Sequence, residues 1–333
     1  MFTLNTSLLV VGFPVIGACP HASLVAHRGD IEGLPWRTFF GEMAGVSNTV
    51  SPVLFDLGTT MRYDESEMSI YVELTDAFNR GQLRAVLSSG QAVVFHQLAV
   101  MSKDGDWILR EDREALEYVL GDLARREAHY RFGAPLDPRW MRGGWSAHFE
   151  FRAGPLRVRT DFVTRPPRLS PETLAALWQQ QEGRSFPVVG VRDLCELKKT
   201  NREKDYAVIG ELARRLESPR DQLQFSRSAR DLFLLAKQHP GLVDELIAER
   251  PLLRTIAQGV EALESALDAE RRRLMHANEA RLQTYLDAAT PWRNAWLEVE
   301  AETAGLPLDA AHRHIVRRAE TLLPFVPSGE TAP

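Results

Sequence analysis

Residues 83–109 read LRAVLSSGQAVVFHQLAVMSKDGDWIL, and this stretch decides the fold. Its apolar start, 83–87, predicts a strand that runs into the turn Ser88-Ser89-Gly90. The apolar residues of 91–100 predict a buried helix. A polar segment with two aspartates follows, and Trp107-Ile108-Leu109 predicts the next strand. The middle of the chain is therefore expected to be mixed α/β structure.

Three aspartates in this region suggest a metal site. Asp104 and Asp106 are separated by one residue, so in an extended strand both carboxylates project from the same face. Like charges repel each other there, and a divalent cation such as Mg²⁺ is the usual reason for such a pair. Asp161, on a strand predicted at 156–163, could supply a third oxygen ligand. The alternative is a solvated turn, because Asp-Gly is a common turn pair.

The spacing of these residues resembles a known signature. Ser88 to Ala92, His96 and Ser102-x-Asp104-x-Asp106 resemble the DNA polymerase β-type nucleotidyltransferase superfamily, with thirteen residues between Gly90 and Asp104. The resemblance implies that Ser89 and Gly90 receive nucleotide phosphates, with Ser102 and Lys103 beside them. Free backbone N–H groups at the start of a helix favour an anion there.

A second stretch, Asp193 to Asp205, reads DLCELKKTNREKD. It resembles the D-L-x-x-L-K-x-x-x-x-R-x-K-D helix of bacterial nucleotidyltransferase-like proteins related to abortive-infection toxin–antitoxin enzymes. The resemblance implies that Lys198 lies near the triphosphate or acts in catalysis, and that Arg202 helps to close the site. On one helix Lys198 and Arg202 would share a face. The alternative is a solvated charged face with an Arg202–Asp205 pair.

The resemblance covers about residues 67–216 and departs from the family pattern at three positions. Gln97 stands where many relatives have glycine after the helix, Val100 where they have arginine, and Ser89 at the first glycine of the pair. The missing arginine removes one phosphate contact. A nucleotidyltransferase fold that has lost catalysis and serves as an interaction module, one half of a toxin–antitoxin pair, is therefore the rival hypothesis.

The remainder of the chain is predicted to be mostly helical. Arg165 and Arg168 follow the strand predicted at 156–163. They either end that strand or line the mouth of the predicted nucleotide-binding cleft. A long helix is predicted from about Pro251, and Trp292 and Trp296, spaced i and i+4, are expected to anchor the last helical packing. Further helices are predicted at 67–80, 111–130, 171–181, 198–215, 232–238 and 242–249.

The composition is that of an ordinary globular protein. The chain has 333 residues, a formal charge of −5, 44% apolar and 26% charged residues, which argues against a disordered, collagen-like or disulfide-stapled chain. Cys19 and Cys195 have no metal spacing and are expected to be free thiols in a reducing cytoplasm. The apolar run Leu8 to Cys19 is shorter than the ~20 residues that span a bilayer. No Lys or Arg precedes it, so a secretory signal and a membrane protein are not favoured.

The sequence thus predicts an α+β fold with a small mixed β-sheet nucleotidyltransferase core flanked by helices, followed by a C-terminal helical lobe. The predicted divisions are a poorly specified extension at 1–65, the core domain at 66–216, a helical domain at 217–325 and a tail at 326–333. Division into two main domains agrees with the chain length.

The predicted function is Mg²⁺-dependent transfer of a nucleoside monophosphate from an NTP to a hydroxyl of RNA, such as tRNA, or of protein. Asp104, Asp106 and Asp161 are the expected metal ligands, and Lys198 joins them as a catalytic residue. The expected nucleotide-binding residues are Ser89, Gly90, Ser102, Lys103, Lys198 and Arg202. An antitoxin partner or self-association through the C-terminal helices is also predicted.

Overall fold

The computed structural model describes residues 65–99 and 102–327, which belong to one compact unit. The predicted extension, apart from residue 65, and positions 328–333 of the predicted tail lie outside the described residues. Cys19 lies outside them too, whereas Cys195 is a free, buried thiol. Among the described helices, none is both long enough and apolar enough to cross a membrane. The cytoplasmic location stays a prediction.

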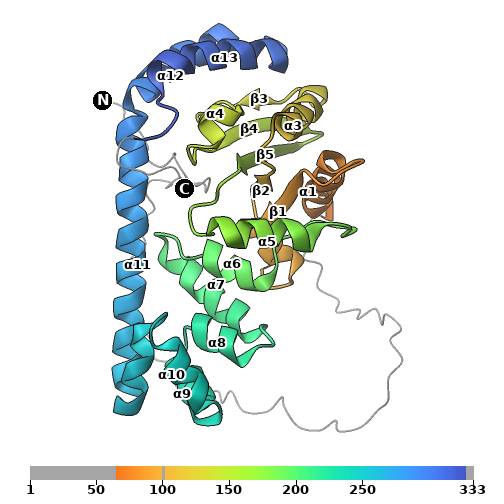
Figure 1. Cartoon of the computed structure of the whole chain (residues 1–333). Coiled ribbons are helices and arrows are strands. Elements are labelled where there is room, and N and C mark those ends of the chain that lie inside the picture. The colour runs from red at the N-terminus through yellow and green to blue at the C-terminus, as the bar shows by residue number, and fades with distance from the viewer. Residues whose placement is uncertain (1–64, 100–101, 328–333) are drawn as a thin grey trace, which may run out of the picture. The chain divides into compact units, whose positions relative to one another are not determined.

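A five-stranded mixed sheet forms the centre of the unit, in the order β1-β2-β5-β4-β3 (Figure 1). β2 and β5 run parallel, and the other neighbours are antiparallel. The strands are β1 Ala85–Ser88, β2 Gly105–Leu109, β3 His129–Tyr130, β4 Ala147–Ala153 and β5 Leu156–Val163. The predicted α+β class, a small mixed sheet flanked by helices with further helices after it, is confirmed.

The helices surround this sheet and continue beyond it. The first seven are α1 Glu65–Phe78, α2 Ser89–Phe95, α3 Arg113–Arg125, α4 Pro138–Met141, α5 Pro171–Gln181, α6 Val191–Leu197 and α7 Glu203–Arg214. After them come α8 Pro219–Phe225, α9 Ala229–Gln238, α10 Pro240–Leu246, the 3₁₀ helix η1 Pro251–Gln258, α11 Val260–Ala288, α12 Thr290–Thr303 and α13 Leu308–Leu322.

Strand β2 divides its side chains between two hydrophobic cores. Trp107 stacks on Phe162, with ring centroids 5.6 Å apart, in the first core, to which α1, α3, α12 and α13 contribute. Ile108 lies in the second core, with side chains of α2, α6 and α7, and its burial contributes about 1.5–3 kcal/mol. Because side chains alternate along a strand, Asp106 shares the face of Ile108. The carboxylate therefore faces the side of the sheet that α2, α6 and α7 cover.

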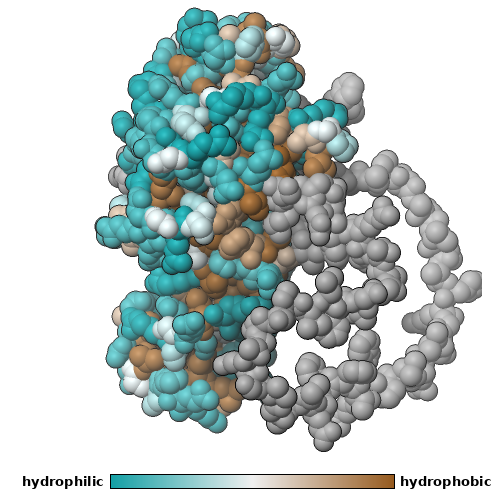
Figure 2. Space-filling view, turned by 90° about the vertical axis from the view of Figure 1, so that its right-hand side faces the viewer, coloured by the Kyte–Doolittle hydropathy of each residue, from teal (hydrophilic) through white to brown (hydrophobic). Residues whose placement is uncertain are grey.

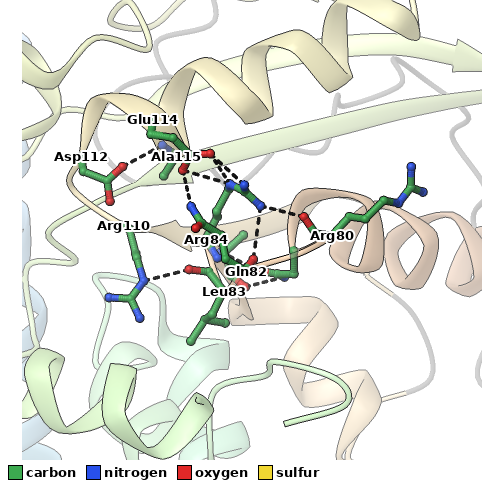
Figure 3. A network of polar contacts seen from close by, with 10 residues as sticks. Arg80, Gln82, Leu83, Arg84, Arg110, Asp112, Glu114 and Ala115 are labelled. Carbon is green, nitrogen blue, oxygen red and sulfur yellow. Dashed lines mark hydrogen bonds and ion pairs between the residues drawn. The ribbon is translucent and has the colours of Figure 1, made fainter. Parts of the chain in front are cut away.

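A charged network ties the start of β1 to the start of α3 (Figure 3). The buried Arg84 guanidinium donates to both oxygens of Glu114, from Nη2 to Oε1 at 2.8 Å and from Nε to Oε2 at 3.1 Å. Its Nη1 also donates to the Arg80 carbonyl at 3.0 Å. The Asp112 carboxylate caps α3 by accepting from the Ala115 N–H at 2.7 Å. These contacts hold the beginning of β1, whose other end carries the turn of the candidate site.

The long helix predicted from Pro251 is wrong in one respect, because the segment forms two elements. Gly259 has φ +98°, a conformation that residues with a side chain rarely adopt, and it separates η1 from α11. Apolar side chains on both sides of this break nevertheless pack together. Leu253, Leu263 and Leu267 are buried in a third hydrophobic core with side chains of α8, α9 and α10.

Helices α12 and α13 share the first core with the sheet. Trp292 and Trp296 pack edge to face with ring centroids 5.4 Å apart, as their spacing predicts. The Trp292 indole donates to the Gly133 carbonyl at 2.9 Å. The last two helices are thus joined to the sheet. The domain boundary predicted between residues 216 and 217 stays a prediction.

One face of the unit, drawn in Figure 2, has hydrophobic residues gathered beside a largely hydrophilic surface. Among the described residues, the exposed large hydrophobic side chains lie on separate helices and connecting segments: Phe95, Leu234, Leu297, Leu306 and Phe325. An antitoxin surface or self-association through the C-terminal helices stays a prediction.

Candidate functional site

Four strands place one polar side chain each in a row across the sheet. Ser88 of β1 lies opposite Asp106 of β2, and Asp106 lies beside Asp161 of the parallel strand β5. Asp161 in turn lies opposite His148 of β4. Cross-strand partners project from the same face, so the sheet register brings together two of the three predicted aspartates.

Asp104 and Asp106 form a buried acidic pair whose negative charges are destabilised. Asp104 is only 4% exposed, and its Oδ1 and the Asp106 Oδ2 are buried oxygens without a hydrogen-bond partner. The nearest ion-pair contact of that Asp104 oxygen is Arg159 Nη1, at 3.8 Å. Burial, and next the negative charge of Asp161, raise the pKa of both carboxyls, most strongly that of Asp106. The alternative of a solvated turn is wrong, because Gly105 begins a buried strand.

The donor set of this pair fits a hard divalent cation. A buried carboxylate oxygen without a partner costs free energy, and a cation would remove both the burial cost and the repulsion. Mg²⁺ is typically held by one or two protein carboxylates, with water and substrate phosphates completing its shell. Within residues 65–99 and 102–327, no three His, Cys, Asp or Glu side chains are arranged as ligands of one ion. Metal binding by Asp104, Asp106 and Asp161 therefore stays a prediction.

Asp161 is held by two other side chains. His148 Nδ1 lies 2.7 Å from Asp161 Oδ1, and Arg131 Nη1 lies 3.3 Å from the same oxygen. On its far side, His148 Nε2 lies 2.8 Å from the Ser146 hydroxyl. Neither of these two partners of Asp161 is predicted from the sequence, and nor is Ser146.

The turn after β1 closes against the loop that precedes β2. A Cβ added at Gly90 would lie 2.2 Å from the Ser102 Oγ, so only glycine allows this approach. The Gln91 side-chain amide donates to the Ser102 carbonyl at 2.7 Å. Ser89, Gly90 and Ser102 are thus brought together, whereas the Lys103 side chain is exposed. A phosphate-binding role of these four residues stays a prediction.

The backbone conformation favours glycine at two positions where this chain has another residue. Ser89 has φ +51° and Gln97 has φ +59°, both in the left-handed region that favours glycine. These are the two positions at which the pattern has glycine. Keeping a side chain there costs about 1–2 kcal/mol each. His96, just before Gln97, is half-buried and its Nε2 lies 2.9 Å from the Val189 carbonyl, outside the row of polar residues.

Lys198 and Arg202 do not share a helix face, and the prediction of one continuous helix there is wrong. α6 ends at Leu197 and α7 begins at Glu203, with Thr200 between them. The Thr200 hydroxyl accepts from the Arg202 N–H at 3.1 Å and donates to Asp205 Oδ2 at 2.5 Å, which offers the backbone an alternative to the helix. The turn still brings both cations to Asp205.

Lys198 Nζ lies 3.9 Å from Asp205 Oδ1, and Arg202 Nη2 lies 2.6 Å from Asp205 Oδ2. Lys198 and Asp205 are 6% and 3% exposed, so the alternative of a solvated face is wrong, although its Arg202–Asp205 pair does form. Burial lowers the pKa of Lys198, and the negative charges of Asp205 and Asp106 partly offset this lowering. The lysine is therefore close enough to the acidic pair to interact with Asp106.

A small cavity lies between the row of polar side chains and the half-buried Arg168. It has a volume of about 40 Å³, and its lining includes Ser88, Ser89, Asp106, Asp161 and Arg168. The Arg168 Nε donates to the Leu197 carbonyl at 3.0 Å, and its Nη1 donates to the Asn278 side chain of α11 at 2.9 Å. Burial and the neighbouring Arg281 lower the pKa of Arg168 to about 10. Of the two arginines after β5, Arg168 is the one that lines the cavity.

His148 could have been found from the sequence. The turn Gly154-Pro155 joins β4 directly to β5, and Ala153 pairs with Leu156. Counting back along this hairpin pairs His148 with Asp161. Arg131 and Arg168 carry no such signal, because neither lies on that hairpin.

Comparison with known proteins adds little to this geometry. No protein-family model matches the chain, and no curated protein matches it either. One similar solved structure is a Helicobacter pylori protein provisionally assigned as a nucleotidyltransferase. Its TM-score is 0.34 and its identity 11%, over 66% of this chain and 98% of that one. Another is JHP933 from Helicobacter pylori, with TM-score 0.33 and 12% identity over 67% and 96% of the two chains. TM-scores this low do not establish a common fold, so the fold and site rest on the strand order, register and contacts described above.

Proposed function

We propose that this chain is a Mg²⁺-dependent nucleotidyltransferase that moves a nucleoside monophosphate from an NTP to a hydroxyl of RNA or protein. In this reaction the acceptor oxygen bonds to the α-phosphorus, the bond to the β-phosphate oxygen breaks, and pyrophosphate leaves. The motifs in 83–109 and 193–205 support the proposal. The observation that carries it is the pair of buried oxygens, Asp104 Oδ1 and Asp106 Oδ2, that accept no hydrogen bond.

Asp104 and Asp106 would hold the cation. When bound, Mg²⁺ would neutralise charge on the phosphates and on the departing pyrophosphate. Asp161 would either add a third oxygen ligand or accept the proton of the acceptor hydroxyl. The parallel register of Asp106 and Asp161 keeps these two roles side by side.

Cations on the helical side would hold the phosphates. Lys198 is near enough to Asp106 to influence its pKa, and Arg168 lines the same cavity as Asp106. Ser89, Gly90, Ser102 and Arg202 would complete the triphosphate contacts. Such fixed charges act by positioning the reactants and stabilising the charge that develops in the transition state.

The small volume of the cavity limits which part of a nucleotide can enter it. A volume of about 40 Å³ corresponds to about three water-sized spaces, enough for a cation and a few waters. A nucleotide is far larger, so its base and sugar would bind outside the cavity. The phosphates alone would approach Asp106 and Arg168.

The direct test is transfer of radiolabel from each α-labelled NTP to total tRNA or to protein, with Mg²⁺. We expect transfer by the wild type and its loss in Asp104→Asn/Asp106→Asn. Asp309→Asn, which alters an exposed carboxylate paired with Arg313, is the control and should transfer normally. No transfer by the wild type, or equal transfer by the double variant, would refute the proposal.

A second candidate is the interaction module without catalysis, as one half of a toxin–antitoxin pair. It is favoured by the pairing of Asp161 with His148 and Arg131, which satisfies that carboxylate without a metal. This candidate predicts that a stoichiometric partner copurifies and that calorimetry detects no Mg²⁺-dependent NTP binding. Micromolar NTP binding that requires Asp104 and Asp106 would count against it.

A further inference from the structure

Lys198 is held on both sides by hydrogen bonds from distant parts of the chain. Arg168 Nε donates to the Leu197 carbonyl at 3.0 Å, and Asn278 Nδ2 donates to the Lys199 carbonyl at 2.7 Å. Arg168 Nη1 in turn donates to Asn278 Oδ1 at 2.9 Å. These two side chains thus bind each other and the two residues that flank Lys198, so they fix the backbone of the turn after α6.

Asn278 comes from the middle of α11, which packs on two different cores. Leu263, near the start of this helix, lies in the third core, and Tyr285, near its end, lies in the first core. Asn278 Nδ2 also donates to the Leu274 carbonyl of the preceding helical turn, at 2.7 Å. The half-buried amide is therefore held by its own helix, and the packing of that helix sets where the amide lies.

Arg168 has polar partners but no carboxylate partner. Arg165, three positions earlier, pairs with Glu111 at 2.7 Å, whereas both hydrogen bonds of Arg168 go to the neutral groups of Leu197 and Asn278. Among the described residues, Arg168 forms no ion pair, and its Nη2 group donates no hydrogen bond. Burial and the nearby charge of Arg281 lower the pKa of Arg168, so an anion would stabilise its charged form.

Phosphate is the anion that this arginine fits. The planar guanidinium presents forked N–H donors that match phosphate oxygens and form strong, charge-assisted bonds with them. Arg168 lines the cavity that Asp106 also lines, and Lys198 is close enough to affect the pKa of both residues. Asn278 does not line this cavity, so it can act on a bound phosphate only through its neighbours.

We propose that Arg168 binds a phosphate of the nucleotide together with Lys198, and that Asn278 is the positioning residue that holds these two cations in place. The inference rests on the proposed function and adds a residue of α11 to its nucleotide site. The hydrogen bond to Arg168 sets the direction of the guanidinium, and the bond to the Lys199 carbonyl fixes the turn that carries Lys198.

Inorganic tripolyphosphate is the probe, because it carries the linked phosphates of an NTP without its base and sugar. Isothermal titration calorimetry on the full-length protein, with and without Mg²⁺, measures its binding without any turnover. We expect Arg168→Gln to weaken binding about 10–100-fold, because hydrogen bonds to a charged group are lost. Arg168→Lys, which keeps the charge without the forked donors, should bind with intermediate affinity.

Two variants of Asn278 test the positioning role. Asn278→Ala removes both hydrogen bonds and should weaken tripolyphosphate binding about tenfold. Asn278→Asp has nearly the same shape, but its carboxylate would neutralise Arg168 and repel the Lys199 carbonyl, so it should also weaken binding. Asn294→Asp makes the same change of charge at an exposed position of α12, and it should bind as the wild type does.

A double variant distinguishes positioning from a general structural role. If Asn278 acts through Arg168, Asn278→Ala should cost less affinity in the Arg168→Gln background than in the wild type. Two independent sites would give effects that multiply. Thermal melting shows whether each variant is folded, and if Asn278→Ala unfolds, the isosteric Asn278→Asp and Arg168→Gln still test the proposal.

The possible failures can be told apart. Wild-type affinity in folded Arg168→Gln, or no tripolyphosphate binding by the wild type with or without Mg²⁺, would overturn the inference. Wild-type affinity in folded Asn278→Asp and Asn278→Ala, or effects that multiply in the double variant, would remove Asn278 as a positioning residue. Loss of binding in the variants, with no label transfer by the wild type, would support the phosphate site and refute the proposed transfer reaction.

Discussion

Replacing Asp106 by asparagine should make the metal-free protein more stable, although it removes a residue of the candidate site. Asp106 Oδ2 is buried without a partner, and Asp161 and Asp104 repel its charge. Asparagine has nearly the same shape and carries no charge. The substitution therefore removes the burial cost and the repulsion without opening a cavity.

The sign of the pH dependence follows from the raised pKa. Above pH 3.8, the ordinary value for Asp, the unfolded chain releases a proton that folded Asp106 retains. Stability therefore falls as the pH rises from 3.8 through the raised pKa of the folded state, and the full loss is present at higher pH. The gain from Asp106→Asn should be largest near pH 8 and small near pH 4.

The size of the gain can be bounded. A buried acceptor without a hydrogen-bond partner costs about 1–3 kcal/mol, and 1 kcal/mol shifts Tm by roughly 2–4 °C in a unit of this size. We therefore expect Asp106→Asn to raise Tm by roughly 2–12 °C at pH 8 in EDTA. Saturating Mg²⁺ at about 100 times Kd would stabilise the wild type by ~2.7 kcal/mol and should reduce or reverse this difference.

Thermal melting at pH 4 and pH 8, in EDTA and in Mg²⁺, gives the difference in Tm between Asp106→Asn and the wild type under all four conditions. Asp122→Asn is the matched control, because that buried carboxylate is satisfied by Arg125 at 2.8 Å and Arg126 at 2.9 Å. It should lose stability under every condition. If Asp106→Asn melts below the wild type at pH 8 in EDTA, the description of Asp106 as a strained carboxylate is wrong.

Three further predictions concern stability elsewhere in the chain. Gln97→Gly should raise the free energy of unfolding by about 1 kcal/mol, because φ is +59° there; a loss in urea denaturation would contradict this. Gly143→Ala should lower it by about 1–3 kcal/mol, because the Cβ would lie 1.8 Å from the Phe325 carbonyl oxygen; unchanged stability would contradict that packing. Burial lowers the pKa of His312, so its contribution is present above pH 6.5 and is lost as the pH falls. His312→Asn, whose amide places a polar atom near the Nδ1 position for the Tyr130 hydroxyl, should therefore lose less stability than the wild type on acidification, and an equal loss would refute this.

Elements with a strong local signal could be predicted from the sequence. β5 and the helix at 171–181 have the predicted bounds, because one alternates in polarity and the other begins with a Ser170 cap followed by proline. The break at Thr200 was missed, because its cause is a side-chain bond to Asp205 that helical spacing alone does not reveal. The break at Gly259 was missed because buried apolar residues continue on both sides of it, at Leu253 and at Leu263.

The candidate site divides in the same way. Asp104 and Asp106 are close in sequence, and their spacing alone predicts a shared face. The placement of Arg168 and Arg131 depends on how distant segments pack, which one sequence does not show. The contact of His148 with Asp161 is more accessible to prediction, because the register of the β4–β5 hairpin pairs the two residues.

The central claim is that Asp104 and Asp106 hold a divalent cation. The most direct measurement is the anomalous scattering of Mn²⁺ in crystals of the wild type and of Asp106→Asn. We predict an anomalous peak in contact with Asp104 Oδ1 and Asp106 Oδ2 in the wild type, and its loss in the variant. A wild-type crystal saturated with Mn²⁺ that shows no peak at these two oxygens would show that the pair does not bind the cation.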